Sequence, residues 1–420
     1  MNRRGLALIR CGAPLALLLC GCAGRGAGDW ADVRDLTPAF LAAGVAGDAA
    51  VAADRHGRIA LTWVTRDSSG QDLWLALSAD SGLTFASPVR VNPRSGSVLS
   101  TPEGRPIATY GAAGELLIAW SERRGDSAGT ADLVVRGSGD GGRTLGPPVV
   151  VNDDVGDLRP GVHGLPSLVA LPSGGWFAVW MDPREHRADG DSASIASLFY
   201  ALSADGGQSW SDNRPLTARA CVGCRPVAAA DPAGRVVVAY RPARDASRDP
   251  ALAVSNDRGM SFPLDTLPTA DDGQPRGGPA EGPSLTLDEG GGGHYAWFTG
   301  AGGDGGDVWV APWRADGGIA GLRRPLSDSL VTARHPRLAR LGEGTLVAVE
   351  GRAREDRSRG VVAVRALDPD GALTPWLFLG ADAGDPWMAA IGERSALLCW
   401  TEHGEGGDRV RLARVTRVVP

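Results

Sequence analysis

A short turn sequence recurs four times along this chain, and it constrains the fold more than any other feature. Each copy fits the pattern S-x-D-x-G-x-[ST], and a Phe or Trp follows directly in three copies. The aspartates are Asp80, Asp140, Asp205 and Asp257, and two shorter versions lie at Asp316 and Asp370. An aspartate in such a turn accepts hydrogen bonds from nearby backbone N–H groups, while the glycine adopts a positive φ. We therefore interpret these aspartates as structural residues that stabilise the turn of each repeat.

The segments around each turn predict four strands per repeat. An apolar run such as 58–64 ends at an aromatic residue, and this aromatic recurs at Trp63, Trp120, Trp180, Tyr240, Trp297 and Trp400, with Glu350 in its place in the sixth repeat. A shorter run precedes it and opens with proline in six repeats. Proline is tolerated at the first residue of a strand. Further strands lie before and after the turn, as in 73–77 and 88–91.

Seven such repeats of four antiparallel strands predict an all-β chain that folds as a seven-bladed β-propeller, with six blades as the alternative. The 60 glycines and 29 prolines among 420 residues disfavour a helical fold. The seventh repeat ends near Val415 without its last strand. Residues 32–38 resemble that strand elsewhere, so we expect the N-terminal segment to complete the last blade within one domain, 30–420.

The first residues have the pattern of an export signal. Three arginines precede an apolar stretch over 13–19, and Cys20-Gly21-Cys22 follows. A small residue before a cysteine resembles the bacterial lipobox, which predicts a signal peptide over 1–21, acylation of Cys22 and a flexible tether over 22–29. Cys20 follows bulky Leu19 and is the weaker choice, and an unmodified secretory signal is the alternative. The prediction is a lipid-anchored protein at the bacterial cell envelope, on its periplasmic or extracellular face.

The charge balance excludes one class of partner. The chain has 43 basic and 49 acidic residues, so its net charge is mildly negative and a nucleic-acid partner is not expected. No other segment approaches the length of a membrane span. We expect a monomer without a cofactor, attached to a membrane only through its lipid, with a carbohydrate or protein as ligand.

The repeated turn is the Asp-box, so residues 30–420 resemble the sialidase-like or BNR/Asp-box propeller superfamily. This resemblance implies the fold, but Asp-box proteins include hydrolases, receptors and assembly factors. Sialidases of the superfamily are six-bladed, bind the substrate carboxylate with three arginines, and use a Tyr/Glu pair. The present sequence departs from them: its first strand, 47–52, lacks arginine, and none of its four tyrosines lies late in the chain.

In this topology the residues just before each innermost strand surround one end of the central channel, and those residues are unusually polar. Arginines gathered there would suit a carboxylate, phosphate or sulfate group. Ordinary solvated loops are the equal alternative. The candidates for a ligand-binding funnel are Arg105, Arg159, His163, Arg225, Arg276, Arg334, His335 and Asp385.

Three residues are candidates for acid–base or nucleophilic roles. Glu350 replaces an aromatic where its strand reaches the funnel, so it either pairs with Arg352 or faces the funnel as an acid, and the pair is favoured. Tyr240 and Glu281, on adjacent blades, are the pair that could act as a Tyr/Glu nucleophile. Tyr240 is also expected to pack like the tryptophans at its position.

Cys221 and Cys224 lie on the funnel loop before the fourth blade. A disulfide is the leading interpretation in an oxidising compartment. Zinc bound by these thiolates with His163 and His335 is an alternative that no ligand spacing supports, so no metal is predicted. Cys399 lies in an apolar run and is expected to be a buried free thiol.

Two functions follow. The first is a binding protein whose charged funnel holds an anionic glycan, a peptide or a partner protein. The second is a sialidase or related glycoside hydrolase with a rearranged active site. We favour the first, because the sequence does not supply a complete set of acid, base and nucleophile.

Overall fold

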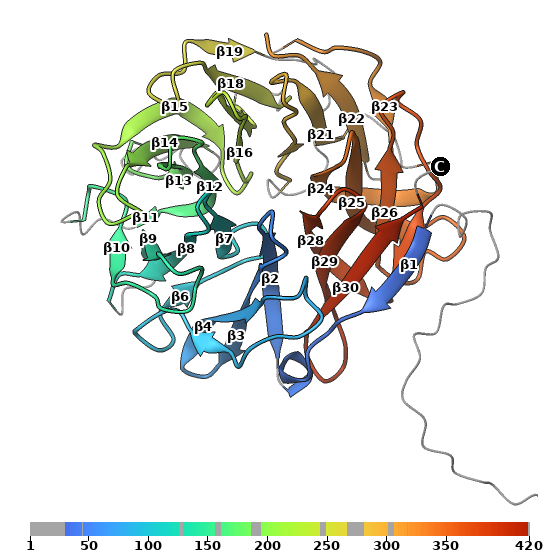
Figure 1. Cartoon of the computed structure of the whole chain (residues 1–420), viewed down its shortest axis with the longest axis horizontal. Coiled ribbons are helices and arrows are strands. Elements are labelled where there is room, and N and C mark those ends of the chain that lie inside the picture. The colour runs from blue at the N-terminus through green and yellow to red at the C-terminus, as the bar shows by residue number, and fades with distance from the viewer. Residues whose placement is uncertain are drawn as a thin grey trace, which may run out of the picture.

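The computed structural model describes residues 30–43, 45–125, 129–155, 161–185, 195–243, 249–266, 281–300, 306–316, 318–326 and 328–418. Over these residues, seven sheets form a ring around a central axis, and the four main strands of each sheet are antiparallel (Figure 1). The prediction of a seven-bladed β-propeller is confirmed. No helix in these ranges is long and apolar enough to cross a membrane.

The blades follow one another along the chain, each running from an innermost to an outermost strand. The first blade contains β2 (Ala46–Ala53), β3 (Ile59–Asp67), β4 (Gly70–Ser78) and β5 (Val89–Arg90). The second contains β7 (Ile107–Tyr110), β8 (Leu116–Arg123), β9 (Thr130–Ser138) and β10 (Pro148–Val150). The third contains β12 (Gly164–Ala170), β13 (Trp176–Asp182), β14 (Ile195–Ser203) and β15 (Arg214–Cys221). Short strands β6 (Val98–Leu99) and β11 (Gly161–Val162) extend the second sheet.

The remaining blades repeat this order. They are β16 (Val227–Ala230), β17 (Val236–Tyr240), β18 (Ala251–Ser255) and β19 (Leu264–Thr266); β20 (Ser284–Leu285), β21 (Gly293–Thr299), β22 (Asp307–Trp313) and β23 (Arg324–Pro325); β24 (Leu330–Leu341), β25 (Gly344–Ala353), β26 (Val361–Leu367) and β27 (Leu377–Leu379); and β28 (Ala383–Ile391), β29 (Ser395–Glu402), β30 (Arg409–Arg417) and β1 (Trp30–Asp35).

The two ends of the chain meet in the last blade. β1 pairs antiparallel with β30, with Val33 opposite Val415, and the Thr37 hydroxyl donates a hydrogen bond to the Leu412 carbonyl. The predicted closure of the ring by the N-terminal segment is therefore confirmed. A short 3₁₀ helix, η2 (Ala39–Ala43), follows β1, and its Phe40 stacks on Trp63 of the first blade.

Apolar side chains between neighbouring blades form the core. Trp120, Trp180, Trp297 and Tyr240, which the repeat pattern aligned, are buried in these contacts. Each repeated turn joins the third and fourth strands of its blade. In the first copy, the Asp80 carboxylate accepts hydrogen bonds from the Thr84 N–H and hydroxyl groups, and the Gly82 N–H donates to the Ser78 hydroxyl. These turns lie on the face opposite the end of the channel where the innermost strands begin.

Candidate functional site

The innermost strands begin with a backbone irregularity in four blades. Asp48, Leu165, His335 and Asp385 have positive φ values between 48° and 55°, and the pairing of their strands shifts register there. Positive φ is unfavourable for residues other than glycine and is often retained at functional sites. Such bulges also change the direction in which a side chain points. Two of these four residues, His335 and Asp385, belong to the site described below.

Side chains from four blades meet across the axis of the ring. Glu103, Arg105, Arg225, Arg337 and Trp387, here called the channel core, come from the second, fourth, sixth and seventh blades. The three guanidinium carbons lie 5.1, 5.5 and 4.8 Å from the centre of the Trp387 ring, which is within the range of a cation–π interaction. The channel core therefore carries a concentrated positive charge.

The arginines of the channel core are almost completely buried, with exposed fractions of 2% for Arg105, 4% for Arg225 and 5% for Arg337. Arg105 donates to the backbone carbonyls of Ala49 and Asp385, and thus joins the second blade to the first and the seventh. Burial alone would raise the pKa of Glu103, but Arg337 and Arg225 lower it to about 2. One carboxylate thus faces three guanidinium groups.

A second group of polar side chains lies at the mouth of the channel and remains partly accessible. We call Glu281, Arg334, His335, Glu350 and Asp385 the mouth cluster. His335 is its centre: its Nδ1 atom lies 2.9 Å from a Glu350 oxygen, and its Nε2 atom lies 3.6 Å from a Glu281 oxygen. The side chain of Arg334 is 48% exposed and its Nε atom lies 3.8 Å from Glu281.

Close backbone packing fixes Glu350. Its second oxygen accepts a hydrogen bond of 2.7 Å from the Asp385 N–H group. A Cβ atom on the preceding residue, Gly384, would lie 3.0 Å from that oxygen. Glycine at 384 therefore permits the contact between the sixth and seventh blades.

The groups of the mouth cluster differ in the direction in which their surroundings shift their pKa values. Burial would lower the pKa of His335, but Glu350, Glu103 and Glu281 raise it to about 10, so the imidazole is cationic at neutral pH. Burial would raise the pKa of Glu350, but His335 lowers it to about 2. Burial dominates at Glu281 and Asp385, and their pKa values are raised. The pKa values of the neighbouring Glu281 and Glu350 are thus shifted in opposite directions.

Two interpretations from the sequence need correction. Glu350 does not pair with Arg352, whose guanidinium donates to the Arg357 carbonyl; Glu350 faces the mouth instead. Tyr240 and Glu281 do not form a pair, because the hydroxyl of the buried Tyr240 donates to Asp265 on its own blade.

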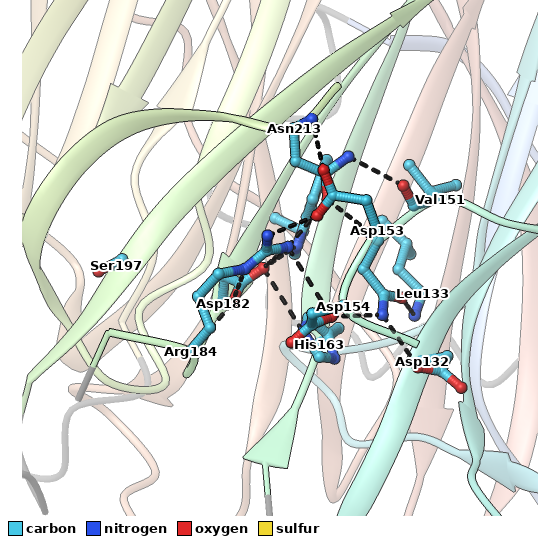
Figure 2. A network of polar contacts seen from close by, with 12 residues as sticks. Asp132, Leu133, Val151, Asp153, Asp154, His163, Asp182, Arg184, Ser197 and Asn213 are labelled. Carbon is cyan, nitrogen blue, oxygen red and sulfur yellow. Dashed lines mark hydrogen bonds and ion pairs between the residues drawn. The ribbon is translucent and has the colours of Figure 1, made fainter. Parts of the chain in front are cut away.

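His163 lies away from the mouth cluster, between the second and third blades (Figure 2). It is fully buried, so it does not form part of an accessible funnel. Its Nδ1 atom lies 2.8 Å from the Ala131 carbonyl, and its Nε2 atom lies 3.1 Å from Asp154 and 3.5 Å from Asp182. Burial would lower its pKa, but the two carboxylates raise it to about 9.

Among the described residues, two groups of side chains have the composition of a metal site: Asp154, His163 and Asp182, and His335, Glu350 and Asp385. In the first, both Asp182 oxygens already accept hydrogen bonds from Arg184, and one also accepts the Trp180 indole N–H. The second lies above the arginines of the channel core. Because of these cationic neighbours, neither arrangement suits a further cation.

The remaining candidate residues from the sequence lie in different parts of the molecule. Arg105 and Arg225 face the channel but are buried in the channel core, beneath the mouth cluster. Cys221 and Cys224 are joined by a disulfide next to Arg225, and Cys399 is a buried free thiol. Arg159, Arg276 and Cys22 lie outside the described residues.

The sequence reasoning missed Arg337 and Trp387. Each directly follows the repeated proline, which lies inside β24 and β28, where the second and fourth blades have Ile107 and Val227. A charged or large aromatic side chain at that position, so close to the axis, is the signal that could have revealed the channel core.

Comparison with known proteins gives the fold. No protein-family model matches the sequence, and no curated protein matches it. A solved ulvan lyase of a polysaccharide lyase family has a TM-score of 0.55 and 11% identity, and the match covers 92% of this chain and 95% of the lyase. The polysaccharide lyase Uly1 has the same score and identity, with coverages of 90% and 91%.

Among solved sialidases, the Hadza microbial sialidase Hz136 has 15% identity and a TM-score of 0.48, with coverages of 84% and 74%. The chain has a β-propeller fold, as its repeats predicted, and the two lyases share that fold at low sequence identity. At these identities the comparisons show the fold alone.

Proposed function

We propose that this protein binds an anionic saccharide at the mouth cluster. The observation that carries the proposal is a half-exposed Arg334 beside a cationic His335, above three buried arginines. Together the mouth cluster and channel core contain five cationic groups and four carboxyl groups. Arg334 has the reach and geometry to bind a carboxylate or sulfate through two hydrogen bonds.

The fold comparison supports a saccharide as the ligand. The ulvan lyase was solved with a GlcA(1-4)Rha3S saccharide, in which the glucuronate and sulfate groups are anionic. At 11% identity this comparison concerns the fold. The charge of the mouth cluster is the property of the present chain that favours the same class of ligand.

Arg334→Ala tests the proposal. Calorimetric titration with oligogalacturonate, sialyllactose and a heparin disaccharide should detect binding of at least one, while neutral cello-oligosaccharides should not bind. Loss of a charge-assisted hydrogen bond costs about 1.5–3 kcal/mol, so we expect Arg334→Ala to raise the Kd at least about tenfold.

Arg314→Ala is the matched control, because Arg314 is also exposed and paired with an acid, Asp316, but belongs to the opposite face. Its affinity should equal that of the unaltered protein. Equal affinities of the Arg334 and Arg314 variants, or equal binding of neutral saccharides, would contradict the proposal.

We further propose that the protein is exported and held at the cell envelope by a lipid on Cys22. The support is the sequence: an apolar stretch followed by a small residue and cysteine. We expect Cys22→Ala to move the protein from the membrane fraction to the soluble exported fraction, as measured by fractionation and immunoblotting. Cys20→Ala is the control and should leave the distribution unchanged.

A further inference from the structure

We propose that the mouth cluster hydrolyses a glycosidic bond of the saccharide that it binds, with Glu281 as proton donor and Glu350 as the ionised carboxylate that faces the reacting sugar. This inference rests on the proposed binding function. It assigns an activity to two glutamates that come from different blades and meet on one histidine.

The geometry supplies the first argument. Glu281 and Glu350 lie on opposite nitrogens of the His335 ring, 3.6 and 2.9 Å away. The ring therefore holds the two carboxyl groups apart, beside the exposed Arg334. Two separated carboxyl groups flanking the bound sugar are the usual requirement for glycoside cleavage.

The environments of the two glutamates supply the second argument. Burial raises the pKa of Glu281, which shifts its equilibrium toward the protonated form, whereas the imidazolium of His335 lowers the pKa of Glu350 to about 2. When two neighbouring carboxyl groups shift in opposite directions, one suits the role of acid and the other stays ionised.

Support from the surrounding backbone supplies the third argument. The buried Arg241 donates a hydrogen bond of 2.7 Å to the main-chain carbonyl of Glu281, and the His335 N–H donates one of 3.3 Å to the Glu281 carboxyl group. The Asp385 N–H donates to one Glu350 oxygen. The two carboxyl groups are thus held by separate blades. Such support is needed when reacting groups must keep a fixed geometry.

The reaction balances with water as co-substrate. The Glu281 proton passes to the glycosidic oxygen while the bond from the anomeric carbon to that oxygen breaks, and its electron pair stays on the leaving oxygen. The Glu350 carboxylate stabilises the positive charge on the sugar. Water then adds to the anomeric carbon and returns a proton to Glu281. The products are two hydroxyl-terminated saccharides.

The test uses the acidic saccharides that bind the unaltered protein, incubated with it in ¹⁸O-labelled water and analysed by mass spectrometry. We expect one ¹⁸O atom at each new reducing end. General acid catalysis contributes roughly 10²–10⁴-fold, so Glu281→Gln should reduce the rate at least about 100-fold without weakening binding more than a few-fold. The rate should fall as the pH rises and Glu281 loses its proton.

Glu289→Gln is the matched control, because Glu289 is exposed on a turn of the opposite face. It should retain the full rate. Melting curves of both variants should match that of the unaltered protein, because glutamine preserves the shape of glutamate.

Saccharides that bind but incorporate no ¹⁸O would overturn the hydrolytic proposal and leave the binding function intact. Unsaturated products without ¹⁸O would overturn it in favour of elimination. An unchanged rate in Glu281→Gln would show that Glu281 is not the proton donor. If no acidic saccharide binds, the proposed function itself fails.

Discussion

At the scale of single residues, His163 shows how one buried side chain joins two blades. Its ring lies between Asp154, which follows the second blade, and Asp182, at the end of a strand of the third (Figure 2). Arg184 contacts both Asp182 and Asp153, so two cationic side chains are shared among three carboxylates. A buried ion network of this kind is strongly destabilised when one member is removed.

We expect His163→Gln to lower the free energy of unfolding by about 3–5 kcal/mol at neutral pH. The pKa of His163 is raised from 6.5 to about 9 on folding, so its stabilising effect is complete below the lower value and lost as the pH rises through the upper one. Chemical denaturation should therefore show the gap between the unaltered protein and the variant narrowing as the pH rises from about 6.5 to about 9 and changing little above that.

His403→Gln is a suitable control, since His403 is exposed and pairs with the exposed Asp408. It should change stability little at any pH in that range. A gap between the unaltered protein and His163→Gln that stays constant across the range would show that His163 is neutral in the folded protein.

At the scale of strands and turns, the sequence predicts the elements well because their rules are local. The aromatic residues in the second strands, the prolines at or within the first strands and the Asp-containing turns each report on a few neighbouring residues. The expected strand ends were less accurate, because most second strands continue past the aromatic and three of the first strands begin before the proline. Glu350 shows the limit. Its partners, His335 and the Asp385 N–H, come from other strands, and nothing local distinguishes them from Arg352.

The channel core was harder to predict for the same reason. Glu103, Arg225 and Arg337 lie on three different blades and meet only after the ring closes. The sequence indicated correctly that polar side chains gather near the axis. It did not indicate which of them would be buried, because burial depends on how closely the seven innermost strands approach one another.

The closing strand belongs to the same scale and gives a direct test. Deletion of residues 30–40 removes β1 and the contact of Phe40 with Trp63. The outer edge of β30 would then expose unpaired backbone groups. We expect the melting temperature to fall by at least about 10 °C and the protein to aggregate more readily. An unchanged melting curve would show that the ring is stable without this strand.

At the scale of the whole molecule, the two faces of the ring carry different kinds of polar groups. The face with the Asp-containing turns has aspartates whose oxygens accept hydrogen bonds from their own turns. The other face carries the mouth cluster, whose charged groups come from separate blades. The turns on one face are thus stabilised by hydrogen bonds within each repeat, while the candidate site forms only when the blades of the ring have assembled.

The pairing of β1 with β30 also dictates an order of events during synthesis. The first strand of the domain leaves the ribosome long before its partner has been made, and the hydrogen bond from Thr37 to Leu412 spans 375 positions. Contacts between such distant residues form slowly. The newly made chain must therefore keep its first strand from pairing with another sheet edge until β30 has been synthesised, and the ring closes only after that.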